Sequence, residues 1–291
     1  PMNAQEWKQH QQVVGNINWL VTKLRVDFSY DLSVLQREKG RKKGPRVSAL
    51  IKANQVLREL KRDSTFKIVM RPIDIKRFGL VVVSDSSLGN VMEDGAALQS
   101  DPSTEKIGTQ GGYLIMFADR ELVDGGVGRF SLLEGKSHKL KRAARSSYAA
   151  EVISVGDAVD VAQGVRDQIP EMLYGPVARG AGMKLSGWQI PMTVATDSKD
   201  GHDRPNSDAG VGSSAQKSVN LELASIREIL DRPQTRVRWT DGTNMLSDVL
   251  TKDMPADHLR EALARGTWSI EFRDGEDGQA RGPGALGGAN A

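Results

Sequence analysis

The stretch Gly79-Leu-Val-Val-Val-Ser-Asp85 decides how the fold of this chain is interpreted. It is a short apolar run of mostly β-branched residues, which is typical of a strand buried on both faces. Two further strand patterns follow, Gly112–Phe117 and Arg129–Leu133, and a glycine-rich connection joins them. This arrangement predicts an antiparallel meander of three strands.

The chain beyond the meander alternates between helical and strand patterns. A long helix is expected from about Ala143 to Gln168, ended by Pro170. The elements expected after it are strand Met192–Thr196, helix Val219–Leu230, strand Arg236–Trp239 and helix Asn244–Leu250. This order predicts an α/β fold, a mixed five-stranded sheet flanked by helices.

Three regions follow from these patterns. Residues 67–273 carry the sheet, and residues 1–66 are predicted to be helical, with helices at Val13–Leu24 and Val47–Leu60. Residues 274–291 are rich in Gly and Ala without periodicity, so we expect a disordered tail. Because the first residue is proline instead of methionine, we interpret the chain as a piece of a longer polypeptide.

Composition and charge exclude several classes of function for this chain. The 291 residues include no cysteine, which excludes disulfide scaffolds, thiolate zinc sites and cysteine nucleophiles. No run approaches the roughly 18 apolar residues that a membrane-spanning helix needs, so no membrane partner is expected. Residues 1–66 hold 13 Lys or Arg against 6 Asp or Glu. Such a basic segment either attracts nucleic acid or is a solvated helical face.

Four acids lie where metal chemistry would need them. Asp85 ends the first strand and Asp197 ends the fourth, and the carboxyl ends of parallel strands meet at one edge of a sheet. Glu151 lies early in the long helix, and Asp248 lies in the last one. Singly, each acid is more often a helix cap or a surface charge. Together, four carboxylates repel one another unless cations neutralise them, and oxygen-only ligands suit magnesium or manganese.

Several motifs share a pattern with one known family. They are Ser84-Asp-Ser-Ser87, Thr109-Gln-Gly-Gly-Tyr113, Arg145-Ser-Ser-Tyr-Ala-Ala-Glu151, Thr196-Asp-Ser198, Lys217–Glu228 and Leu246-Ser-Asp-Val-Leu-Thr-Lys252, with Asn18-Trp-Leu20 and Leu24-Arg-Val-Asp27 upstream. In these motifs the chain resembles the carboxyl end of a copia-type retrotransposon Pol polyprotein. That region covers the end of the reverse transcriptase and the ribonuclease H domain.

The resemblance implies a fold, an activity and a set of partners. It implies a ribonuclease H-like fold over residues 67–273, preceded by a helical remnant of the reverse transcriptase in residues 1–66. It implies two-metal hydrolysis of the RNA strand in RNA–DNA hybrids, with two magnesium ions, or manganese as a substitute. The implied partners are the hybrid, the missing polymerase domain and the integrase of the same polyprotein, in a cytoplasmic particle or the nucleus. The catalytic and metal-binding set implied is Asp85, Glu151, Asp197 and Asp248.

A basic run leads into the helix that carries Glu151. Its side chains are expected to contact the phosphates of the hybrid, or else to form a solvated helix start. These predicted nucleic-acid-binding residues are Lys139, Lys141, Arg142, Arg145, Ser146 and Ser147.

One alternative to an active ribonuclease H stays open at this point. The family usually has Asn at the position of Ser198 and often Glu at that of Ala149, which motivates a catalytically decayed module that binds nucleic acid or packs on a polymerase. Related enzymes place a histidine before the last acid, a role either vacant here or taken by Asn244. An integrase-type transferase fits poorly, because its glutamate comes last and here it is the second acid.

Overall fold

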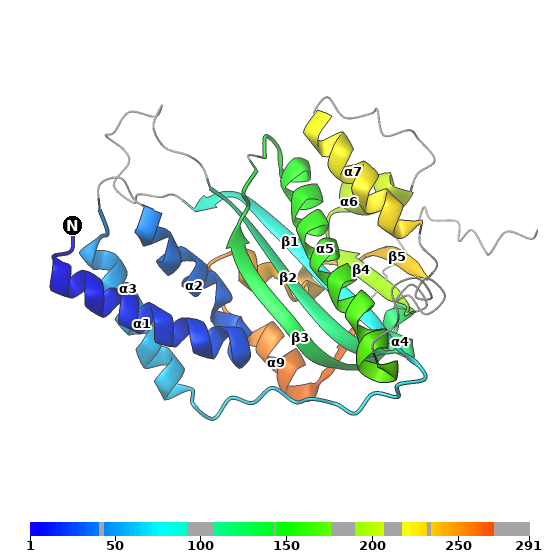
Figure 1. Ribbon diagram of the computed structural model, residues 1–291, viewed down its shortest axis with the longest axis horizontal. Coiled ribbons are helices and arrows are strands. Elements are labelled where there is room, and N and C mark those ends of the chain that lie inside the picture. The colour runs from blue at the N-terminus through cyan, green and yellow to red at the C-terminus, as the bar shows by residue number, and fades with distance from the viewer. Residues whose placement is uncertain are drawn as a thin grey trace, which may run out of the picture.

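The computed structural model describes residues 1–40, 44–91, 108–142, 144–175, 190–206, 217–231 and 234–270. These residues form a mixed sheet of six strands in the order β5-β4-β1-β2-β3-β6, shown in Figure 1. The strands are β1 (Phe78–Val91), β2 (Gly108–Asp119), β3 (Val127–Lys139), β4 (Met192–Thr196), β5 (Thr235–Trp239) and β6 (Thr267–Ser269). The predicted tail, residues 274–291, lies outside the described residues.

β1 is the centre of the sheet, as its apolar sequence predicts. It pairs with β2 in antiparallel register and with β4 in parallel register, and Leu80 to Val83 have no exposed surface. β5 continues the parallel pairing beyond β4. The predicted α/β class and mixed sheet are therefore confirmed. β6 is a sixth strand that the sequence did not reveal, because only three of its residues pair with β3.

Side chains alternate between two cores, one on each face of the sheet. Leu80, Val82 and Ile115 face α5 (Ser147–Tyr174) and α7 (Lys217–Leu230). Val81, Val83, Leu114 and Met116 face the opposite side, where α4 (Arg120–Val123), α8 (Asp248–Thr251) and α9 (Asp257–Arg265) pack. A sheet covered on both faces explains why β1 is a continuous apolar run.

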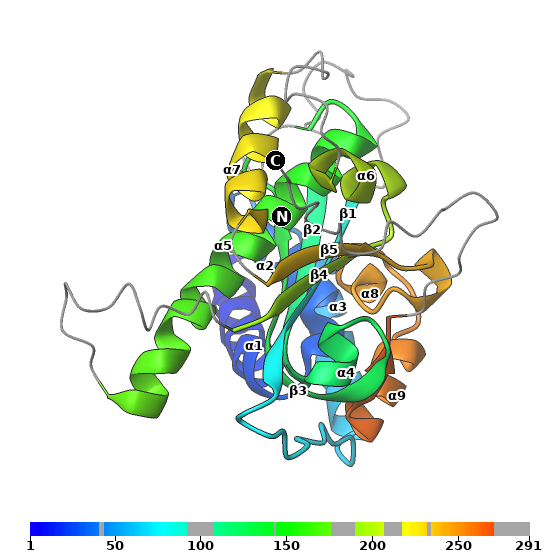
Figure 2. The ribbon, with the colours of Figure 1, turned by 90° about the vertical axis from the view of Figure 1, so that its right-hand side faces the viewer.

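Two of the helix predictions are wrong in their extent. α5 continues through Pro170 to Tyr174, and Figure 2 shows its carboxyl end extending past the sheet. Proline removes one helical hydrogen bond at a cost of about 3 kcal/mol, and the buried Ile169 holds the chain helical across it. The single helix expected over Asn244–Leu250 is instead a 3-10 turn, η6 (Gly242–Asn244), followed by the short α8.

The amino-terminal segment is helical, as predicted. It contains α1 (Ala4–Lys23), α2 (Ser29–Gln36) and α3 (Val47–Arg62), with the 3-10 turns η1 (Val26–Phe28) and η2 (Arg37–Gly40). α1 starts earlier than expected because Asn3 and Glu6 form a capping box. The three helices share an apolar core of their own, and α2 also contacts β3. None of the helices in the described ranges has the length and apolarity to cross a membrane.

A buried ion network joins the amino-terminal helices to α9. The Asp27 carboxylate accepts hydrogen bonds from Arg25 Nε and Nη2 at 3.0 and 2.9 Å and from Arg260 Nε at 2.7 Å. Its side chain has no exposed surface. Both guanidiniums also lie over the ring of Phe28. Asp63 also contacts both guanidiniums, at 3.0 Å from Arg25 and 3.8 Å from Arg260, so two carboxylates compensate the two partly buried cations, and Asp27 is the fully buried one.

Replacing Asp27 with asparagine tests this network. Asp27→Asn removes the buried counter-charge of two guanidiniums and leaves them only the partly exposed Asp63, and we expect the free energy of unfolding to fall by about 3–5 kcal/mol. Urea denaturation measures it. Glu121→Gln is the matched control, because it breaks an exposed pair with Arg77 and should cost less than about 1 kcal/mol. Equal losses in the two variants would show that the network contributes no more than a surface pair.

Candidate metal centre

Three of the predicted acids meet at one edge of the sheet. Asp85 lies on β1, Asp197 directly follows β4, and Asp248 is the first residue of α8. One carboxylate oxygen of each lies within 4.8 Å of the others. The parallel pairing of β1 and β4 places the first two side by side, as the sequence predicts.

Gly112 allows α8 to bring Asp248 to this point. It pairs with Asp85 across the β1–β2 ladder, and a Cβ atom on it would lie 2.6 Å from Leu250 Cβ and 2.9 Å from Thr251 Cγ2. Only a residue without a side chain lets α8 cross β2 so closely. From there the Thr251 hydroxyl donates a hydrogen bond to Asp85 Oδ2.

Gly111 and Gln110, which precede Gly112 on β2, connect the acidic site to α5, α2 and β3. A Cβ atom on Gly111 would lie 2.6 Å from Leu140 Cδ2 and 3.0 Å from Ser154 Oγ, so this glycine admits α5 on the other face. The buried Gln110 amide donates to Ser33 Oγ of α2 at 2.8 Å and to Ser137 Oγ of β3 at 2.6 Å. The Thr109–Tyr113 motif thus connects α2, the sheet and α5 next to the acidic site.

Glu151 lies beside the three aspartates on α5 and is 9% exposed. Ser86 Oγ donates a hydrogen bond to its Oε1 at 2.8 Å, whereas Oε2 has no partner among the described residues. Glu151 and Asp197 line an open cavity of about 690 Å³. The other lining residues are Ser147, Tyr148, Ser198, Lys199, Asp200 and Asp203.

Burial and mutual repulsion shift the acids toward their neutral forms. Burial, followed by the nearby charge of Asp85, raises the pKa of Glu151 to about 9. Burial raises the pKa of Asp85 to about 7, with Lys252 and the Thr251 hydrogen bond acting in the opposite direction. Burial and the charge of Asp248 also raise the pKa of Asp197. The site therefore holds more negative charge than its surroundings compensate.

Lys252 is the one cation that contacts the group among the described residues. Its Nζ lies 2.5 Å from Asp248 Oδ1 and 3.7 Å from Asp85 Oδ2. The remaining demand for positive charge, the unpartnered Glu151 Oε2 and the all-oxygen donor set fit a hard divalent cation better than zinc. Asp85, Asp197, Asp248 and Glu151 are the residues that would hold it.

The predicted nucleic-acid-binding residues are spread around this edge. Lys139 at the end of β3, Lys141 and Arg145 are exposed, and Ser147 lines the cavity. Arg142 is bound to Glu222 of α7, and Ser146 caps α5 by accepting a hydrogen bond from the Ala149 backbone at 3.1 Å. Their contact with nucleic acid stays a prediction.

Sequence reasoning missed several residues of the site. Thr251 and Lys252 were part of a quoted motif without a role, and their contacts with Asp85 depend on how α8 crosses β2. α6 (Lys199–Asn206) supplies Lys199, Asp200 and Asp203 to the wall of the cavity.

Asn244 has a role in holding β6. Its amide donates to the Ser269 carbonyl at 2.7 Å, and its oxygen accepts from Trp268 Nε1 at 3.2 Å. Both ends of the side chain are therefore engaged at the edge of the sheet, which leaves Asn244 poorly suited to replace a catalytic histidine.

An antiparallel meander extended by two parallel strands, with helices on both faces, defines the class of this chain: an α/β protein built on a mixed six-stranded sheet. No protein-family model matches the sequence, and no curated protein is significantly similar to it.

Solved structures that align with this chain include a ribonuclease H domain, a protease-reverse transcriptase and a nuclease, each with a TM-score of 0.36 or lower. The N-terminal ribonuclease H domain of a Mycobacterium tuberculosis protein, fused to maltose-binding protein, aligns at 14% identity and TM-score 0.35, over 64% of this chain and 96% of that one. A foamy viral protease-reverse transcriptase in complex with an RNA/DNA hybrid aligns at 14% and 0.36, over 74% of this chain and 28% of that one. The NurA nuclease of Sulfolobus solfataricus aligns at 10% and 0.26, over 69% and 60%.

The raised pKa values predict how stability depends on pH. The ordinary pKa values are 3.8 for Asp85 and 4.5 for Glu151, and in the fold they are about 7 and about 9. Between those limits the folded state binds more protons than the unfolded state, so the free energy of unfolding should fall as pH rises. Urea denaturation in EDTA measures this slope. Glu151→Gln should flatten it up to about pH 9; an unchanged slope would contradict the assignment.

The close approach at Gly112 gives a second prediction. Gly112→Ala should push α8 away from β2, lower the free energy of unfolding by about 1–3 kcal/mol and weaken the stabilisation by added magnesium. Thermal unfolding with and without magnesium measures both effects. Gly164→Ala is the control, because a Cβ atom there meets nothing within 4 Å and helix propensity should improve. A Gly112→Ala variant with full magnesium response would show that α8 does not need this contact.

Proposed function

We propose that this chain is a metal-dependent ribonuclease H that hydrolyses the RNA strand of RNA–DNA hybrids. The observation that carries the proposal is the group formed by Asp85, Asp197 and Asp248, whose carboxylate oxygens lie within 4.8 Å of one another. These acids come from three separate elements at one sheet edge, beside an open cavity. Such a group is costly in a fold unless it binds cations.

The four acids would together hold two magnesium ions. Asp85 and Asp197 would contact both ions, and Glu151 and Asp248 would complete one each. Bound magnesium, or manganese in its place, supplies an activated water and stabilises the leaving oxygen in phosphodiester hydrolysis. Ser86 holds the Glu151 carboxylate and Thr251 holds that of Asp85, so both are oriented before substrate arrives.

Substrate recognition would use the exposed side chains around the cavity. Lys139, Lys141 and Arg145 are exposed cations suited to contact phosphates, and Ser147 lies at the cavity wall. The 2′-hydroxyl groups of the RNA strand distinguish a hybrid from DNA in the minor groove. Arg142, which is bound to Glu222, would contribute by keeping α5 and α7 together at this edge.

The sequence resemblance supports a copia-type Pol polyprotein as the context. In that context residues 1–66 are the end of the reverse transcriptase, and residues 67–273 are its ribonuclease H domain. The polymerase domain and the integrase of the same polyprotein would be the partners inside the cell. The Gln110 contacts between α2 and the sheet give the amino-terminal helices a place beside the nuclease domain.

One observation favours the alternative of a non-catalytic module. The Lys252 ammonium lies 2.5 Å from Asp248 Oδ1, so part of the negative charge is already compensated without a metal ion. A module that only binds nucleic acid would need no more than this. Hydrolysis separates the two functions.

Cleavage of a labelled RNA–DNA hybrid in magnesium tests the proposal. The wild type should cut the RNA strand only, and Asp85→Asn should lower the rate by more than the about 10–100-fold that loss of a ligand-orienting residue costs. Asp203→Asn is the control, because Asp203 lines the same cavity outside the three-aspartate group and should keep activity within a few-fold.

The outcomes distinguish the two functions. RNA cleavage that Asp85→Asn abolishes and Asp203→Asn retains would support the enzyme. Hybrid binding without cleavage in magnesium or manganese would establish the non-catalytic module instead. Circular dichroism of Asp85→Asn accompanies the assay, because an unfolded variant would mean that Asp85 is a structural residue.

A further inference from the structure

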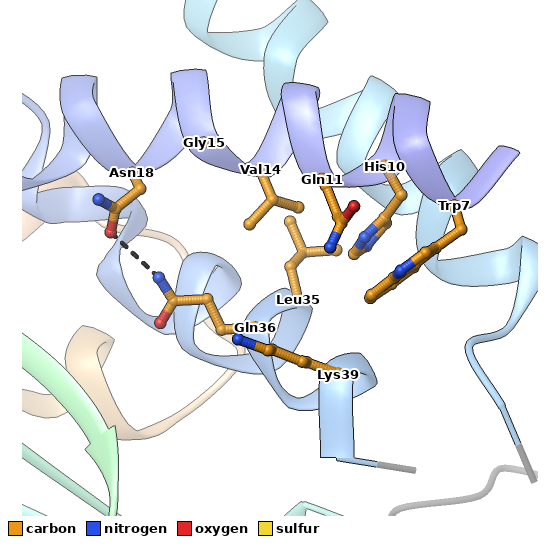
Figure 3. Close-up of a pocket in the computed structure, with 9 residues that line it drawn as sticks. All are labelled: Trp7, His10, Gln11, Val14, Gly15, Asn18, Leu35, Gln36 and Lys39. Carbon is orange, nitrogen blue, oxygen red and sulfur yellow. Dashed lines mark hydrogen bonds between the residues drawn. The ribbon is translucent and has the colours of Figure 1, made fainter. Parts of the chain in front are cut away.

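A second cavity, separate in its residues from the acidic site, lies between α1 and the α2–η2 segment, and we call it the α1–α2 groove (Figure 3). Its volume is about 410 Å³, within the range of small-molecule sites. The residues that line it are Trp7, His10, Gln11, Val14, Gly15, Asn18, Leu35, Gln36 and Lys39.

His10 is a buried polar group without a partner in this groove. It is 2% exposed, and neither ring nitrogen has a hydrogen-bond partner among the described residues. Its ring stacks on that of Trp7, with centroids 5.2 Å apart and planes inclined by 13°. Burial lowers the pKa of His10, so the ring offers one donor and one acceptor at neutral pH. Buried polar atoms are normally bonded, and an unpaired one marks a place where a ligand can supply the bond.

The groove is kept open by a glycine in the middle of α1. A Cβ atom on Gly15 would meet nothing within 4 Å, so packing does not require glycine there. Glycine has a low helix propensity, and every residue other than proline would favour the helix more. What glycine provides at this position is empty space in the wall of the groove, between Gln11 and Asn18 (Figure 3).

The remaining lining groups match the chemistry of a nucleotide. Gln11, Asn18 and Gln36 offer amide donors and acceptors, the groups that recognise the edges of bases. Asn18 and Gln36 already hold each other by a hydrogen bond of 3.0 Å. Lys39 adds a positive charge, no acid is among the described residues that line the groove, and residues 1–66 carry more than twice as many basic as acidic residues.

We propose that the α1–α2 groove binds one nucleotide of single-stranded nucleic acid, with its base against Trp7 and its phosphate at Lys39. The ring of Trp7 provides a stacking face, which recognises any base, and the amides contact its edge. α2 also contacts α8, the element that carries Asp248, so the groove and the acidic site lie on neighbouring elements. The inference deepens the proposed function, on which it rests: the groove would hold a single strand that extends from the hybrid.

Binding of a labelled single-stranded oligodeoxynucleotide to the full chain in EDTA tests the proposal, with fluorescence anisotropy as the readout. Trp7→Ala removes the stacking face, and Gly15→Leu fills the groove while favouring the helix. Each variant should weaken binding about tenfold or more. Trp19→Ala is the control, because Trp19 lies on the same helix, is 62% exposed and does not line the groove.

The outcomes separate this proposal from the ribonuclease proposal. Absence of single-strand binding by the wild type, or an equal loss in Trp19→Ala and Gly15→Leu, would overturn the groove as the binding site. Cleavage of a blunt hybrid by the wild type is measured in parallel with magnesium. Cleavage without groove-dependent binding would refute only the groove, and groove-dependent binding without cleavage would refute only the nuclease.

Discussion

Four consecutive parallel pairs, from Leu80 with Met192 to Val83 with Ala195, hold the first half of β1 beside β4. All four β1 side chains are fully buried, two on each face, so a slip by one residue would exchange the contents of both cores. This register fixes where Asp85 and Asp197 emerge. The remainder of the site is built on it, because α8 reaches Asp85 only by crossing β2 at Gly112.

The sequence predicted those parts of the fold that rest on local pattern. The apolar run of β1 and the acids that follow the buried runs of β1 and β4 could be identified, because the hydrophobic pattern and the strand direction can be inferred from neighbouring residues. The extension of β1 through Ser84 to Ser87 could not, because these polar residues pair with Gln110 to Tyr113 on a strand far along the chain. The same holds for β6, whose three residues depend on β3. Thr251 and Lys252 gain their contacts only from the approach that Gly112 permits.

The acidic site shows how a fold accommodates charge that it needs for binding. Glu151 and Asp85 have raised pKa values because they are buried near other acids, which is unfavourable for the empty protein. Lys252 offsets part of this cost at Asp248, and Ser86 and Thr251 offset part at the other two acids. Glu151 Oε2 keeps no partner among the described residues, and one carboxylate oxygen of each aspartate lies within 4.8 Å of those of the other two.

The Asp27 network affects how the protein can fold during its synthesis. Asp27 and Arg260 are separated by 233 residues along the chain, yet their side chains are in contact. At translation speeds of about 5–20 residues per second, Arg260 follows Asp27 from the ribosome after about 10–50 seconds. During that interval the amino-terminal helices can form their own core, but Asp27 has only Arg25 as a counter-charge. The amino-terminal helices can therefore complete their contacts with α9 only after the chain has been synthesised beyond Arg260.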